Sequence, residues 1–121
     1  MENVSINFSY NWNCKLNNKA FTTIRIHNQL KYQVGKTYQV FLNGRSMGKA
    51  ILKEKRVLGL NQLNNFICYI DTGYNQQETL NILKQMYRHI NLQTVLFDFC
   101  LLVYIKPSKQ EIKEMQRTLE L

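Results

Sequence analysis

Thr23 and Arg25 are the two residues best suited to bind a polar or negatively charged ligand. They alternate in the segment Phe21–His27, so an extended backbone places both side chains on one face. The Arg25 guanidinium could hold a phosphate through two hydrogen bonds or stack on a base. The alternative is that Arg25 is an ordinary exposed arginine of a sheet. A threonine hydroxyl can contact the ligand or, beside an activating lysine, act as a nucleophile. The simpler interpretation of Thr23 is a residue selected for its β propensity.

Lys19 and Asp71 are further candidates for the same site. Lys19 lies just before Thr23, and we expect it to contact phosphate, because a base acting near neutral pH would require desolvation or a cationic neighbour. Asp71 precedes Thr72-Gly73, where a carboxylate either caps a turn or contributes an acid to a cleft. The sequence leaves both roles of Asp71 open.

Four aromatic residues are candidates for a surface on which a base stacks: Trp12, Phe21, Tyr32 and Tyr74. In a domain of this size, aromatic side chains more often belong to the core. Phe21 is the strongest of the four, because its side chain falls on the same predicted face as Thr23 and Arg25.

The net charge of +8 is confined to one half of the chain. Residues 1–56 contain ten lysines and arginines and two acids, whereas residues 57–121 contain six of each. A positive surface attracts phosphate and gains free energy from counterion release, so this asymmetry favours RNA or a nucleotide as the partner. The alternatives are a solvated basic face without a function and a basic face that binds a protein.

Several other classes of protein fit the sequence poorly. No segment reaches the roughly 18 apolar residues of a membrane span, and the first residues do not resemble a secretory signal. Cys14, Cys68 and Cys100 form no C-x-x-C pair, and His27 and His89 have no metal-ligand spacing. We therefore expect a reduced, cytoplasmic protein with no membrane contact, no metal and no cofactor.

Short strands and helices are predicted around these candidates. The strands cover Val4–Tyr10, Phe21–His27, Thr37–Leu42, Gly48–Val57 and Thr94–Ile105. In the second of them Thr22, Ile24 and Ile26 form the face predicted to contact the core, which leaves the face of Thr23 without core contacts. Asn43-Gly44 indicates a type I′ hairpin turn.

Two helices are predicted between the hairpin and the last strand, near residues 61–71 and 76–88. The first has helical spacing of its apolar residues Leu63, Phe66, Ile67 and Ile70. The second opens with Asn75-x-x-Glu78 and buries Leu80, Leu83 and Tyr87. Asp98, inside the apolar last strand, is expected to be satisfied by hydrogen bonds at a barrel rim.

Residues 107–121 are predicted to form an added amphipathic helix. Pro107 ends the last strand, and Ser108-x-x-Glu111 opens a helix with Ile112, Met115 and Leu119 on one stripe. This stripe packs on the domain or forms a dimer contact, so we expect a monomer or a weak homodimer. The order of elements predicts an α+β domain built on a mostly antiparallel sheet or small barrel.

The run Lys19-Ala20-Phe21-Thr22-Thr23-Ile24-Arg25, followed by Tyr32-x-x-Gly35-Lys36, resembles the signature of ASCH domains, a branch of the PUA-like barrels. In that family a Lys-Thr-x-Thr-x-Arg-like strand precedes an x-x-Gly-Asp motif and a hairpin, and two helices and a long strand complete the domain. The resemblance implies a PUA-like small β-barrel over residues 1–106. It also implies a cleft beside the Thr-x-Arg strand that receives RNA or a nucleoside, with Lys19, Phe21, Thr23, Arg25 and Lys36 as contacts.

Some small bacterial ASCH members deacetylate 4-acetylcytidine with a lysine, a threonine and a glutamate. Carried over by position, the threonine falls on Thr23, and the lysine falls on Ala20 unless one insertion brings it to Lys19. The glutamate falls near Asp71 or Thr72, neither of which is a glutamate, so we expect no deacetylation. The prediction is an RNA- or modified-nucleoside-binding module; a 4-acetylcytidine-type amidohydrolase and a basic protein-interaction module are the alternatives.

Overall fold

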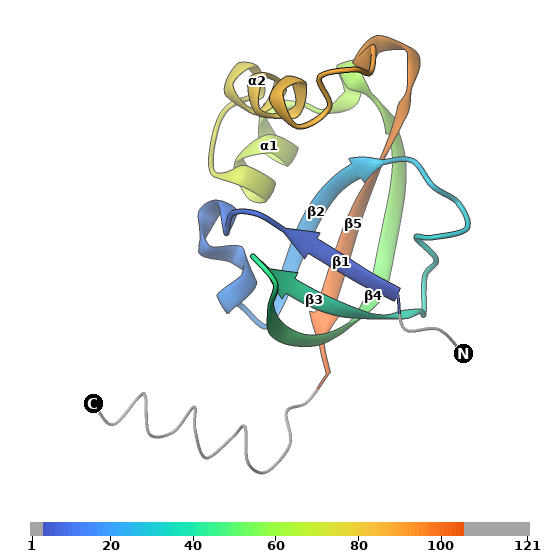
Figure 1. Cartoon of the computed structure of the whole chain (residues 1–121). Coiled ribbons are helices and arrows are strands. Elements are labelled where there is room, and N and C mark those ends of the chain that lie inside the picture. Colours follow the sequence, from blue (N-terminus) through green and yellow to red (C-terminus); the bar gives the residue numbers. More distant parts are fainter. Residues whose placement is uncertain (1–3, 106–121) are drawn as a thin grey trace.

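The computed structural model describes residues 4–105 as an α+β fold in which one curled sheet carries two helices at one end (Figure 1). The strands are β1 (Val4–Phe8), β2 (Ala20–Ile26), β3 (Thr37–Leu42), β4 (Arg45–Gly59) and β5 (Leu96–Tyr104). The helices are α1 (Asn65–Thr72) and α2 (Gln76–Met86), and the 3-10 segments are η1 (Trp12–Asn17), η2 (Leu60–Gln62) and η3 (Leu92–Thr94). The strands and helices predicted within this range are confirmed with shifted ends, and the helix predicted over residues 107–121 lies outside it.

The sheet has the order β1-β3-β4-β5-β2, so β1 and β2 are its two edges. Neighbouring strands are antiparallel except β1 and β3, which run parallel. The long strand β4 pairs with β3 over its first half and with β5 from Ala50 to Gly59. By spanning both halves it curls the sheet into a half-barrel, with an open seam between the edges β1 and β2 (Figure 1).

The hairpin between β3 and β4 combines a tight turn with a β-bulge. Asn43 and Gly44 have φ of 50° and 80°, which confirms the predicted type I′ turn. The register then shifts between Val40 and Phe41, leaving Met47 as the extra residue of a β-bulge. The next residue, Gly48, has φ of 121°, a conformation that L side chains rarely adopt.

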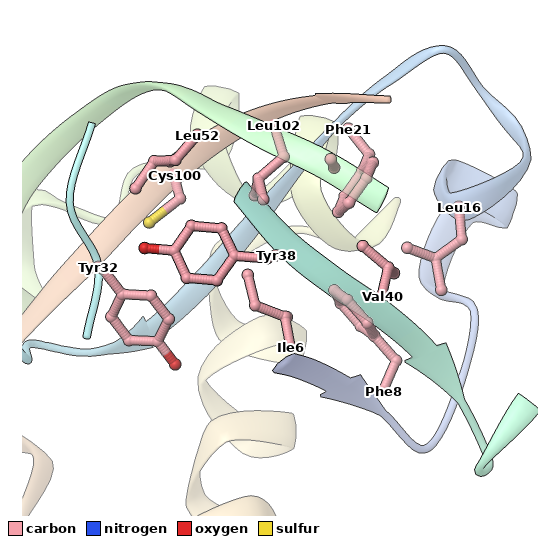
Figure 2. Packing of buried hydrophobic residues seen from close by; sticks show 11 residues of the cluster. Ile6, Phe8, Leu16, Phe21, Tyr32, Tyr38, Val40, Leu52, Cys100 and Leu102 are labelled. Carbon is pink, nitrogen blue, oxygen red and sulfur yellow. The ribbon is translucent and has the colours of Figure 1, made fainter. Parts of the chain in front are cut away.

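Hydrophobic clusters lie on both faces of the sheet. The inner cluster fills the half-barrel, and Figure 2 shows its side chains from β1 and β3 facing those from β2, β4 and β5. Its members include Ile6, Phe8, Phe21, Tyr38, Val40, Leu52, Cys100 and Leu102. The outer cluster lies between the sheet and the helices and contains Ile24, Leu63, Cys68, Leu83, Leu92 and Phe97.

The predicted division of β2 into a core face and a free face is wrong. Ile24 joins the outer cluster, as expected, but Phe21 and Thr23 on the other face are only 3% and 2% exposed. In a curled sheet the concave face is enclosed by the opposite edge of the same sheet. A strand with one evidently apolar face can therefore have its second face buried as well.

The predicted orientation of α1 is only partly correct. Phe66 and Ile70, expected in the core, are 73% and 43% exposed, whereas Asp71 and Thr72 are buried. Leu63 is buried but precedes the helix, which begins after the N-cap residue Asn64. Ile67 packs against the outer cluster as expected, but the buried side of the helix also includes Asp71 and Thr72, which have polar partners inside the molecule.

Candidate functional site

The seam between β1 and β2 contains a pocket of about 70 Å³. Asn7 and Phe8 of β1 and Thr23 and Arg25 of β2 contribute to its wall, and further residues come from η1 and the helices. Sites for drug-sized ligands typically occupy roughly 300–1,000 Å³. The pocket can therefore enclose a small chemical group or the edge of one ring, while the rest of a larger ligand would lie outside it.

Arg25 connects the two edges of the sheet across the seam. Its Nε donates a hydrogen bond to Thr23 Oγ1 (2.9 Å), and an Nη donates to the main-chain oxygen of Asn7 (2.9 Å). The guanidinium carbon lies 4.6 Å from the centre of the Phe8 ring, within cation–π range. These contacts use two of the five guanidinium N–H groups. Arg25 thus fixes the wall of the pocket and also supplies a cation to it.

Lys15 and Asp71 form a buried ion pair in the same pocket. Lys15 Nζ donates to Asp71 Oδ1 at 2.8 Å, and Thr22 Oγ1 donates to the same oxygen at 2.8 Å. Each member of the ion pair is 4% exposed. Burial lowers the pKa of Lys15 below its usual value, the charge and hydrogen bond of Asp71 oppose this, and the charge of Arg25 adds to the lowering.

An unusual backbone in η1 directs Lys15 into the pocket. Asn13 and Cys14 have φ of 59° and 53°, in the left-handed region, which kinks the segment between its two 3-10 turns. Asn11 Oδ1 accepts a hydrogen bond from the main-chain nitrogen of Leu16 (2.9 Å) and holds the turn. Lys15 and Leu16 are consequently buried, while the preceding Asn13 and Cys14 are exposed.

Two threonines complete the polar wall and join the helices. The hydroxyl oxygens of Thr72 on α1 and Thr79 on α2 are 2.8 Å apart, and Thr72 Oγ1 also donates to the main-chain oxygen of Cys68 (2.9 Å). Both side chains are buried and have hydrogen-bond partners within the protein. We interpret them as residues that position α1 and α2 around the pocket.

A row of aromatic rings lies at the same site. Trp12 lines the pocket, and its ring centroid is 4.5 Å from that of Tyr10 and 6.2 Å from that of Tyr74. Tyr10 is 55% exposed and Tyr74 is 42% exposed. Partly exposed aromatic rings next to a pocket that contains a guanidinium suit a planar ligand, because a base can stack on either group.

The structure brings together part of the site expected from the sequence. Thr23, Arg25 and Asp71 line one pocket, and the stacking candidates Trp12 and Tyr74 are in contact beside it. Of the two roles open to Asp71, its position matches the cleft acid, since its carboxylate binds a lysine and a threonine hydroxyl.

Other expected site residues lie elsewhere. Lys19 is exposed and Lys36 is partly exposed, and neither lines the pocket. Phe21 and Tyr32 are 3% and 5% exposed within the inner cluster, so their rings have core contacts. Both were candidates for a stacking face, with Phe21 the stronger, and their packing inside the half-barrel leaves both rings covered.

Sequence reasoning missed Lys15. It lies in a polar, asparagine-rich segment without periodicity, and its partner Asp71 is 56 residues further along the chain. One available signal was the carboxylate itself, because Asp71 follows the apolar run Phe66–Ile70 and a carboxylate buried in a helix needs a cation. Nothing in the sequence indicates which of the lysines would supply it.

A second buried carboxylate, Asp98, holds the segment that follows β2. It is 0% exposed and accepts a hydrogen bond from the main-chain nitrogen of Asn28 at 2.9 Å. His27 Nδ1 lies 2.7 Å and Lys55 Nζ 3.9 Å from its Oδ1. The expectation that hydrogen bonds satisfy Asp98 is confirmed, and we interpret the group as an anchor for the β2–β3 connection.

Comparison of the chain with protein-family models, with curated proteins and with solved structures found no match. Within residues 4–105, no three or more His, Cys, Asp and Glu side chains form a group that could hold a metal ion. The helices of that same range are too short or too polar to cross a membrane.

Proposed function

We propose that the chain binds RNA or a modified nucleoside at the seam, as a PUA-like module of the ASCH type. The observation that carries the proposal is the gathering of three features around one small pocket: the Arg25 guanidinium, the buried Lys15–Asp71 pair and the exposed aromatic row. The aromatic faces would stack on a base. The pocket would receive one edge or substituent of that base, and Arg25 would contact a phosphate or the base itself.

The distribution of charge supports a polyanionic partner. Residues 4–105 contain twelve lysines and arginines and four acids. Two of those acids, Asp71 and Asp98, are buried beside basic side chains, which leaves only Glu54 and Glu78 exposed. The exposed charges of this range are therefore predominantly basic, and its surface should attract phosphates.

The fluorescence of Trp12 gives a direct test, because Trp12 is the one tryptophan in the sequence and lines the pocket. We expect nucleosides and mononucleotides to quench it in a saturable titration. Arg25→Ala should weaken mononucleotide binding about ten- to hundredfold, the usual cost of a lost charge-assisted contact. Lys49→Ala is the matched control, because Lys49 is exposed and does not line the pocket. Absence of quenching by any nucleoside or mononucleotide at low salt would contradict the proposal.

A second candidate is an amidohydrolase of the 4-acetylcytidine type, favoured by one specific observation. Lys15 from η1 lies beside Asp71, so a lysine–carboxylate pair exists even though β2 has Ala20 at the position of the family lysine. In such a reaction the Thr23 hydroxyl or a water would attack the acetyl carbon, and the C–N bond would break. The amine would take up a proton. Direct attack by water would release acetate in that step, whereas attack by Thr23 would leave an acetyl ester that one water then hydrolyses to acetate.

Two hydrogen bonds count against this second candidate. Thr23 Oγ1 accepts a hydrogen bond from Arg25 Nε, and a guanidinium cannot take up the hydroxyl proton of Thr23. The threonine whose hydroxyl donates to the Asp71 carboxylate is Thr22 and not Thr23. We therefore expect no release of cytidine when the protein is incubated with 4-acetylcytidine and the products are separated by chromatography. Release by the wild type that disappears in Thr23→Val would instead establish the hydrolase.

A further inference from the structure

Helix α1 presents its polar residues to the interior and its aromatic residues to solvent. The side chains of Cys68, Asp71 and Thr72 are buried, while Phe66, Tyr69 and Ile70 are 73%, 53% and 43% exposed. Single exposed apolar residues are ordinary in proteins, but adjacent large ones indicate a contact surface. Here three occur at positions i, i+3 and i+4 of one helix and so form one face.

The aromatic row of the seam includes a residue that follows directly after α1 along the chain. Helix α1 ends at Thr72 with Gly73 as its C-cap, and the next residue, Tyr74, packs against Trp12. Gly73 itself lies against η1, since a Cβ at this position would come within 3.1 Å of Asn13 Oδ1. We define the stacking surface as Phe66, Tyr69 and Ile70 of α1 together with Tyr74 and Tyr10.

We propose that the stacking surface binds a single-stranded RNA segment of several nucleotides, whose terminal or flipped base occupies the seam pocket. This inference rests on the proposed function and specifies its ligand as a strand and not a free nucleoside. Four of the five side chains are aromatic, and every base has a face that can stack on an aromatic ring. Helix α1 has eight residues and is about 12 Å long, which matches three to four bases stacked at roughly 3.4 Å.

Charge favours a polyanion over a second copy of this chain. Two copies would bring together molecules that each have a net charge of +8, and self-repulsion at such a charge opposes association. Asp71 is the one charged residue within α1 and its carboxylate is buried, so the stacking surface has no acidic group of this helix that would repel a phosphate backbone. The basic residues elsewhere on the surface would contact the phosphates.

The test measures binding of oligouridylates of increasing length by Trp12 fluorescence and by the anisotropy of a labelled octamer. For the wild type we expect affinity to rise from uridine monophosphate to the tetramer and the octamer, and to fall as salt is raised. Tyr69→Ala and Phe66→Ala should each weaken octamer binding about five- to hundredfold, the range of one lost stacking contact. Both should leave binding of the mononucleotide unchanged, because these side chains do not line the pocket. Leu30→Ala, which removes a side chain that is 80% exposed in the β2–β3 connection, is the control.

The outcomes separate this inference from the proposed function. Equal affinity for the mononucleotide and the octamer, with Tyr69→Ala indistinguishable from wild type, would overturn the inference and leave the pocket as a nucleoside site. Octamer binding that depends on Tyr69, without any mononucleotide binding, would refute the pocket as a nucleoside site and would retain the stacking surface as the site for the strand. A dimer seen by sedimentation that Tyr69→Ala dissociates would assign the surface to a second copy, and would overturn the inference as well.

Discussion

Replacing Lys15 by methionine removes the cation of the buried pair while retaining a side chain of similar length. In the wild type, Lys15 Nζ lies 2.8 Å from Asp71 Oδ1 and 5.5 Å from the centre of the Phe8 ring. The methionine keeps the apolar packing on that ring but leaves the Asp71 carboxylate with only the Thr22 hydroxyl as its donor on Oδ1. The variant therefore isolates the effect of the charge.

The size of the effect follows from the burial of both groups. Two unit charges 2.8 Å apart attract with about 6 kcal/mol at an effective dielectric constant of about 20. Part of this is offset by the desolvation that Lys15 no longer undergoes, and breaking a buried pair typically destabilises proteins by about 3–5 kcal/mol. With an m-value of about 1.5 kcal/mol per molar, the urea midpoint should fall by about 2–3 M.

Urea unfolding followed by circular dichroism measures this change, and two further variants provide controls. Lys19→Met, four residues along the chain at an exposed position, should change the free energy of unfolding by no more than about 0.5 kcal/mol. The double variant Lys15→Met with Asp71→Leu replaces the pair by apolar side chains and should recover most of the loss. A loss below about 1 kcal/mol in Lys15→Met alone would refute the conclusion that the ion pair is buried and coupled.

Two further predictions concern the inner half-barrel. Gly48→Ala should lower the free energy of unfolding by about 1–3 kcal/mol, because the φ of 121° is strained for alanine. The control is Gly59→Ala, where φ is −80°, and it should be close to neutral in the same urea assay. Burial raises the pKa of the Cys100 thiol to about 12, so above about pH 9 the unfolded chain loses a proton that the folded protein keeps, and stability falls by about 1.4 kcal/mol per pH unit. Cys100→Ala should reduce the slope of the urea midpoint against pH between about pH 9 and 11, and an unchanged slope would contradict the assignment.

Local signals in the sequence were sufficient to predict the strands and the hairpin. The alternation in Phe21–His27 and the pair Asn43-Gly44 depend on backbone geometry within a few residues, and both appear in the structure as expected. The face of a strand or helix that becomes buried depends on distant partners. Thr23 is buried because the sheet curls over it, and Phe66 is exposed because the opposite side of its helix pairs with Lys15.

The candidate site could be predicted only in part for the same reason. Arg25 and Thr23 could be predicted because they share one face of a strand whose sequence resembles a family signature. The bond from Arg25 to the main-chain oxygen of Asn7 could not be foreseen, since it depends on how closely two sheet edges approach each other. Lys15 required the left-handed backbone at Asn13 and Cys14, for which no short sequence pattern is diagnostic.

The position of β5 within the sheet has a consequence for the order of folding. β5 follows every other described element along the chain, yet it lies between β4 and β2. β2 has no other strand partner, and its first pair joins Ala20 to Val103. Closing such a long loop has an entropic cost that slows folding. During synthesis, β1, β3 and β4 can assemble early. β2 stays unpaired until β5, which ends at residue 104, has left the ribosome. The seam between β1 and β2 therefore forms last, after all five strands have been translated.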